Sequence, residues 1–113
     1  MFDFQKLSVY QKALQFNRDI VPVLSSLKDR TINDQLKRAA LSIVLNISEG
    51  TSRFSNSDRK RFYIISRGST YESAALLEYL LGLNLIEKSQ FKNLITSLEE
   101  ISKMLFSMIR QLE

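Results

Sequence analysis

The feature that most constrains the fold is an unbroken apolar repeat in the last quarter of the chain. From about residue 87 to the end, apolar side chains recur at intervals of three and four. This spacing is typical of an amphipathic helix, whose apolar stripe must pack against other elements. The stripe consists of Phe91, Leu94, Ile95, Leu98, Ile101, Met104, Leu105, Met108, Ile109 and Leu112.

Three earlier segments have the same period and predict helices at about 6–27, 31–50 and 57–83. In the first of these helices, Pro22 predicts a kink or an early end, because proline has no N–H and its ring crowds the preceding turn. The second is expected to begin at Thr31, in a capping box with Asp34, and to end at Gly50 in a left-handed conformation. Its predicted core stripe is Ile32, Leu36, Ala39, Ala40, Ile43 and Ile47.

The third helix is expected to begin near Ser57 and to end near Asn84. Small residues at helical spacing mark a side on which a neighbouring helix could approach closely, among them Ser66, Gly68 and Ser73. The predicted core stripe of this helix is Phe62, Ile65, Ser69, Leu76, Leu80 and Leu83.

Four amphipathic helices with short connections predict the architecture. Short connections force consecutive helices to lie antiparallel. The chain has 113 residues with one proline and three glycines, a length that suits one domain and a composition that favours helix. We therefore expect an all-α, antiparallel up-down-up-down four-helix bundle that forms a single domain over residues 1–113.

The composition argues against most catalytic and metal chemistry. Cysteine and histidine are both absent, which removes thiolate chemistry, the commonest general base and the commonest metal ligand. We expect no enzymatic activity, no cofactor and no metal. No secretory signal and no apolar run of the ~20 residues needed to cross a bilayer is visible, which predicts a soluble, cytoplasmic protein without a membrane partner.

Basic residues concentrate around the second connection. Five basic residues and the single acidic Asp58 lie between positions 53 and 67, a local excess of +4 that equals the formal net charge of the whole chain. Phosphates could bind here, with Phe54 or Tyr63 stacking on a base. The alternative is an ordinary solvated helix end. The candidate nucleic-acid-binding residues are Arg53, Phe54, Arg59, Lys60, Tyr63 and Arg67, with Arg61 adding charge.

Two further sets of residues have structural interpretations. Glu72 is expected near the inward side of its helix, where a lone carboxylate needs a partner, and Arg38 on the neighbouring helix is the candidate. Glu49 is expected to pair with Arg53 or Arg59. Leu41 and Leu45 form a second apolar patch opposite the core stripe. Together with Leu77, Leu81 or Ile64 on outward faces, this patch predicts a homo-oligomer.

The residues resemble those of the 23S rRNA intervening-sequence proteins nearly from end to end. The resemblance rests on FQKLSVYQKAL, QLKRAALSIVLNISEG, RFYIISRGSTYE, LLGLNLIEKSQF and ISKMLFSMIRQL, in this order and spacing. The second and third motifs are the most specific. The chain departs from the family at Ser48, where alanine is frequent, at Lys37, where arginine is frequent, and at Pro22.

The resemblance implies an up-down bundle that assembles as a ring-shaped homopentamer and has no enzymatic activity. Some members of this family are encoded within insertions in 23S rRNA genes. Relatives serve diversity-generating retroelements, where a basic surface is thought to contact nucleic acid and a reverse transcriptase. We therefore expect a non-enzymatic, oligomeric protein that binds RNA or DNA, with RNA favoured. The alternative is a scaffold subunit that contacts a partner protein and whose basic patch is incidental.

Overall fold

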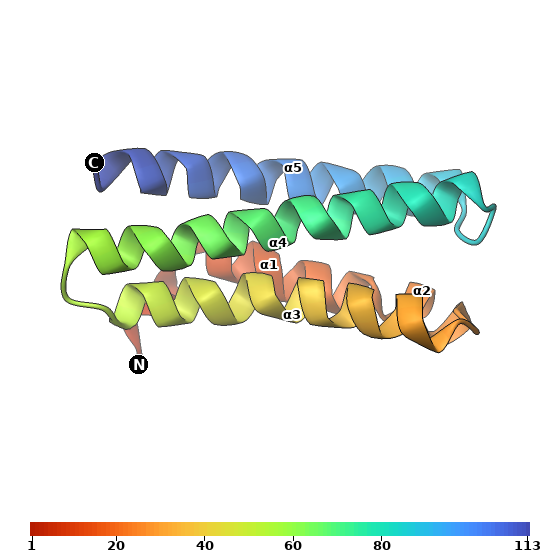
Figure 1. The fold of residues 1–113 in the computed structure, drawn as a ribbon, viewed down its shortest axis with the longest axis horizontal. Helices are drawn as coiled ribbons and strands as arrows, with labels where there is room; N and C mark the ends of the chain where they lie inside the picture. Colours follow the sequence, from red (N-terminus) through yellow and green to blue (C-terminus); the bar gives the residue numbers. More distant parts are fainter.

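The computed structural model describes all 113 residues as a bundle of antiparallel helices without strands (Figure 1). α3 lies beside α4, α4 beside α5, α5 beside α1, and α1 beside α3, so that α1 and α4 are diagonal partners. The predicted all-α, up-down four-helix bundle is confirmed. None of the helices combines the length and the apolarity that crossing a membrane requires. The elements are η1 (Asp3–Lys6), α1 (Ser8–Asp19), α2 (Val21–Ser26), α3 (Arg30–Ser52), α4 (Asn56–Gly82) and α5 (Lys88–Gln111).

The first leg of the bundle is broken at the place that Pro22 predicts. α1 ends at Asp19, and Pro22 occupies the first turn of the short α2, where its missing N–H leaves no helical bond unmade. Only Ile20 lies between the two helices. Its polar link to α3 is Asn17, whose Nδ2 donates to the carbonyl oxygens of Ala13 and Ala40, each at 2.9 Å.

The helix ends differ from three sequence predictions. α3 begins at Arg30, because Asp29 rather than Thr31 is the cap: its Oδ1 accepts from the backbone N of Thr31 at 2.9 Å and of Ile32 at 3.2 Å. α4 begins one residue early, capped by Ser55. Gly50 does not end α3 in a left-handed conformation, since the helix continues to Ser52.

Asn84 ends α4 as predicted. Its φ of 58° is the only positive value at a non-glycine residue in the chain. Asparagine tolerates this conformation better than most side chains do. The turn that follows leads into α5, whose first residue is Lys88.

The core runs along the bundle axis and includes most of the predicted stripes. The α3 residues Leu36, Ala40, Ile43 and Ile47 are fully buried, as the period of that segment predicts. In the α5 stripe, Leu94, Leu98, Ile101, Leu105 and Ile109 are buried, and the other members are partly buried against the core. In α4 the prediction is wrong by about one residue: Ile65 and Leu83 are exposed, whereas Leu77, expected on the outside, is fully buried.

Small polar side chains form much of the buried side of α4, which explains this rotation. Ser66, Ser69, Thr70 and Ser73 are buried. The hydroxyl of Ser66 donates to the carbonyl oxygen of Ile43 on α3 at 2.8 Å, and Thr70 and Ser73 donate within their own helix. Because their polar groups are satisfied and their volumes are small, α3 and α4 can pack closely along most of their length.

Candidate functional site

The basic connection lies at one end of the bundle. The α3–α4 turn, the N-terminus and the C-terminus all meet there, while the α2–α3 and α4–α5 connections lie at the opposite end (Figure 1). The turn is short because α3 ends at Ser52 and α4 begins at Asn56. We call Arg53, Phe54, Arg59, Lys60 and Arg61 the turn patch.

Arg53 is held in place by its neighbours. Its Nη2 donates to Glu49 Oε1 at 2.6 Å, the pairing expected for Glu49. Its guanidinium also lies 4.7 Å from the centroid of the Phe62 ring. The guanidinium of Arg61 lies 4.6 Å from the same centroid. The ring of Phe62 therefore contacts two guanidinium groups. The sequence did not indicate this role, because Arg53 lies in the turn after α3, whereas Arg61 and Phe62 lie in α4.

The other cations of the turn patch have no carboxylate partner. Arg59 donates from Nε to the carbonyl oxygen of Arg53 at 2.6 Å, which ties the first turn of α4 to the end of α3. Lys60 and Arg61 make no ion pair, since the chain contains only the Glu49–Arg53 pair and a Lys12–Glu100 pair. The positive charge of Arg59, Lys60 and Arg61 therefore remains available to an anion.

The two candidate stacking residues differ in exposure: Phe54 lies on the surface and Tyr63 is buried. Phe54 is fully exposed, at 102% of its reference accessible area. Tyr63 is only 4% exposed, and its hydroxyl lies 2.7 Å from Thr51 Oγ1. The prediction that Tyr63 could stack on a base is therefore wrong: the inward side of α4 includes this residue, and its ring packs against α3 at Gly50.

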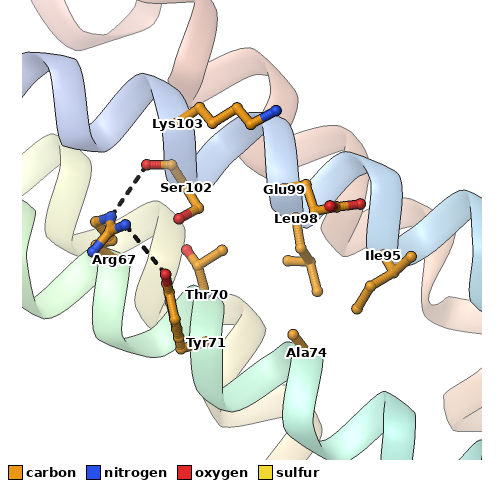
Figure 2. A pocket seen from close by; sticks show the side chains of 9 residues that line it. All are labelled: Arg67, Thr70, Tyr71, Ala74, Ile95, Leu98, Glu99, Ser102 and Lys103. Carbon is orange, nitrogen blue, oxygen red and sulfur yellow. Dashed lines mark hydrogen bonds between the residues drawn. The ribbon is translucent and has the colours of Figure 1, made fainter.

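Arg67 lies outside the turn patch, in the seam between α4 and α5. Figure 2 shows its two bonds, from Nε to the Ser102 carbonyl oxygen at 3.3 Å and from Nη2 to the Tyr71 hydroxyl at 3.2 Å. The rings of Tyr71 and Phe106 lie 5.0 and 5.3 Å from the guanidinium. A groove of about 440 Å³ continues from this point along the seam.

The predicted Arg38–Glu72 pair does not form. Both side chains are exposed, and neither takes part in an ion pair. The cause is again the rotation of α4. Ser69 and Ser73 occupy the buried side of that helix, so Glu72 lies toward solvent and has no desolvation to offset.

The predicted exposed leucines are confirmed. Leu41 is 48% and Leu45 54% exposed, and Ile64 on α4 is 49% exposed. Leu81 is half-buried against the core and Leu77 is buried, so neither extends this apolar surface. The chain has no group of three or more Asp and Glu side chains placed to hold a metal ion.

Comparison with known proteins agrees with the resemblance seen in the sequence. A family model described as 23S rRNA-intervening sequence protein matches residues 5–107. A solved structure from Bacteroides thetaiotaomicron VPI-5482, described as a protein with unknown function from the S23 ribosomal protein family, has a TM-score of 0.83 and 28% sequence identity to this chain. The match covers 89% of this chain and 97% of that one. No curated protein matches the chain.

Proposed function

Because the chain belongs to the 23S rRNA-intervening sequence protein family, we propose that it is a non-enzymatic protein that binds nucleic acid, RNA in preference to DNA, through the turn patch. It acts as a homo-oligomer in the cytoplasm, and the family resemblance favours a ring of five copies. The observation that carries the proposal is the fully exposed ring of Phe54 in the turn, together with three cations early in α4, Arg59, Lys60 and Arg61, none of which is paired with a carboxylate.

This arrangement suits a single-stranded ligand. Cations bind phosphates and release counterions, while an exposed ring stacks on an unpaired base of any sequence. Bases inside a duplex are not available for stacking, which favours loops, bulges and single strands of RNA. Base specificity should be weak, because the turn patch has no set of side chains arranged to read base edges.

Oligomerisation would multiply a weak site. One turn patch holds few phosphates, but several copies around an axis form a continuous positive field and bind a long strand together. The exposed leucines of α3 supply apolar surface for such an assembly. The same surface also suits the alternative function, a scaffold subunit that contacts a partner protein and does not bind nucleic acid.

A matched pair of charge reversals tests the proposal. Lys60→Glu with Arg61→Glu reverses two cations of the turn patch. Lys88→Glu with Lys92→Glu reverses two exposed cations at the opposite end of the bundle. Both double variants take the formal net charge from +4 to zero, so they differ only in where the charge changes. Arg59 is left intact because it bonds the backbone of the turn.

Fluorescence anisotropy with a labelled single-stranded RNA, a hairpin and a DNA duplex, titrated from about 50 to 200 mM salt, is the measurement. We expect the intact protein and the Lys88/Lys92 variant to bind RNA with a steep salt dependence, and the Lys60/Arg61 variant to lose binding. Equal loss in both double variants would indicate a general charge effect rather than a site. No binding of any probe at the low-salt end would favour the scaffold function.

Phe54→Ala separates stacking from charge. Removing one stacking ring should weaken single-stranded RNA binding by ~1–3 kcal/mol, roughly 5- to 150-fold, and leave the slope against salt unchanged, because no phosphate contact is lost. An unchanged affinity would mean that the turn patch acts through charge alone.

A further inference from the structure

Large apolar side chains lie on both the inward and the outward side of α4, although much of the inward side is small and polar. Its inward side is covered by α3 and α5, but its outward side exposes Ile64 (49%), Tyr71 (59%) and Tyr79 (56%). Large apolar side chains that gather on an exposed face commonly mark an interaction site. No other helix of the chain covers this side.

A hollow lies on this outward side, where α4 meets α5. It measures about 570 Å³ and is lined by Ile64, Arg67, Gly68, Tyr71, Phe106 and Ile109. A Cβ at Gly68 would have no atom within 4 Å, so the α4 backbone is open to an approaching side chain at this point. We call this feature the α4–α5 hollow.

The charge in the α4–α5 hollow is not neutralised within the chain. Arg67 directs two of its N–H groups to Ser102 and Tyr71 and makes no ion pair. A guanidinium has five N–H donors, so three of them have no acceptor in this chain. An occupant of the hollow that excluded water would need to bring a carboxylate for this cation.

The outer face of α3 has the complementary chemistry. Leu41 and Leu45 are exposed and one helical turn apart, and we call them the α3 ridge. Asp34, seven residues before Leu41, and Glu49, four residues after Leu45, lie on the same side of the helix. Glu49 is already paired with Arg53, whereas Asp34 makes no ion pair. Apolar anchors at this spacing, bracketed by carboxylates, are what a helix presents when it lies in a groove.

We infer that the α3 ridge of one copy docks into the α4–α5 hollow of a second copy, with a leucine beside Gly68 and the carboxylate of Asp34 beside Arg67. A chain cannot fill its own hollow, because α3 makes no contact with α5 and the ridge lies on its outer face. The inference rests on the proposed homo-oligomer and names the two faces that meet. Since these faces differ, the contact is heterologous, and each copy can be followed by another to close a ring.

Complementary variants test which faces meet. Leu41→Glu with Leu45→Glu removes the ridge, and Gly68→Arg fills the hollow with a second cation where there is open space. We expect each variant alone to sediment as the 13.1 kDa monomer. A 1:1 mixture should give a species of twice that mass and nothing larger, because one intact ridge and one intact hollow remain in each pair.

The controls keep the outcomes distinct. Val21→Glu with Leu85→Glu changes two exposed apolar residues outside both faces and should retain the mass of the intact protein. Circular dichroism checks folding, and Leu41→Ser with Leu45→Ser replaces the glutamates if they disturb the helix. A Gly68→Arg variant that keeps the mass of the intact protein, or a mixture that stays monomeric, overturns the inference. An intact protein that is itself monomeric defeats the proposed homo-oligomer, whatever the faces, and leaves the RNA test unaffected.

Discussion

The ring of Tyr63 occupies the space in which a side chain at Gly50 would begin. A Cβ on Gly50 would lie 2.8 Å from Cε1 and 2.9 Å from Cδ1 of Tyr63, and 3.1 Å from Cβ of Phe62. The Tyr63 hydroxyl meets Thr51 Oγ1 at 2.7 Å, one residue farther along α3. This contact fixes how the last turn of α3 sits against the first turns of α4, and therefore where the turn patch lies.

Gly50→Ala should destabilise the protein although it places a better helix former within α3. Alanine gains about 1 kcal/mol of helix propensity over glycine. Against this, a methyl group that forces a buried, hydrogen-bonded ring to move costs ~1–3 kcal/mol, to which the Phe62 contact adds. We expect a net loss in the free energy of unfolding, measured by denaturant titration. Gly82→Ala, where a Cβ meets nothing within 4 Å, is the control and should not destabilise. A Gly50→Ala protein as stable as that control would refute the close contact.

Tyr63→Phe should lower stability and leave RNA binding unchanged. Thr51 Oγ1 donates to the Ile47 carbonyl oxygen, so the Tyr63 hydroxyl is the donor in their mutual bond. Its removal costs about 0.5–1.5 kcal/mol, the net value of one hydrogen bond. An RNA affinity that fell with Tyr63→Phe as far as with Phe54→Ala would show that the buried ring reaches the ligand after all.

Glu72→Ala should be nearly neutral. A buried pair with Arg38 would make this substitution cost several kcal/mol, whereas an exposed, unpaired carboxylate contributes within about 0.5 kcal/mol. The free energy of unfolding of each single variant, Glu72→Ala and Arg38→Ala, is measured by chemical denaturation. A loss above about 2 kcal/mol in either variant would restore the pair that the sequence suggested.

Glu100 should titrate below its ordinary range. The hydrogen bond from Lys12 Nζ, at 2.7 Å, and then the charge of Lys12 lower the pKa of this carboxyl. Because the folded-state pKa is the lower one, the contribution of Glu100 to stability is present above its ordinary pKa and is lost as the pH falls through the folded value. Carboxyl-carbon NMR should show a low midpoint that rises in Lys12→Met and in high salt. If the titration midpoint of Glu100 were the same in Lys12→Met as in the intact protein, another group would be responsible for the lowered pKa.

α5 and α3 show what a one-dimensional pattern can predict. In both helices the inward stripe is far more apolar than the outward side, where α3 carries only Leu41 and Leu45 as exposed leucines, so the contrast between the two sides identifies the core directly. The break at Pro22 and the end of α4 at Asn84 were also readable, since each follows from the backbone geometry of one residue type. The sequence did not identify the cap at Asp29, because Thr31, two residues on, is also a preferred cap residue and begins a capping-box pattern with Asp34.

α4 and the candidate site show where the pattern fails. α4 has large apolar residues on both its buried and its exposed side, and much of its buried side consists of small polar residues. Its periodicity therefore does not identify which side faces inward. That choice follows from the fit of Ser66, Ser69 and Ser73 against α3 and of Tyr63 against Gly50. Because of this rotation of α4, Tyr63 is buried, Glu72 lies away from Arg38, and Arg67 lies in the seam with α5. The residues alone determined that the chain is a four-helix bundle with a basic turn, because hydrophobic period and charge are local properties. Which side chains the bundle offers to a ligand was decided only in three dimensions, because helix rotation depends on how neighbouring surfaces pack.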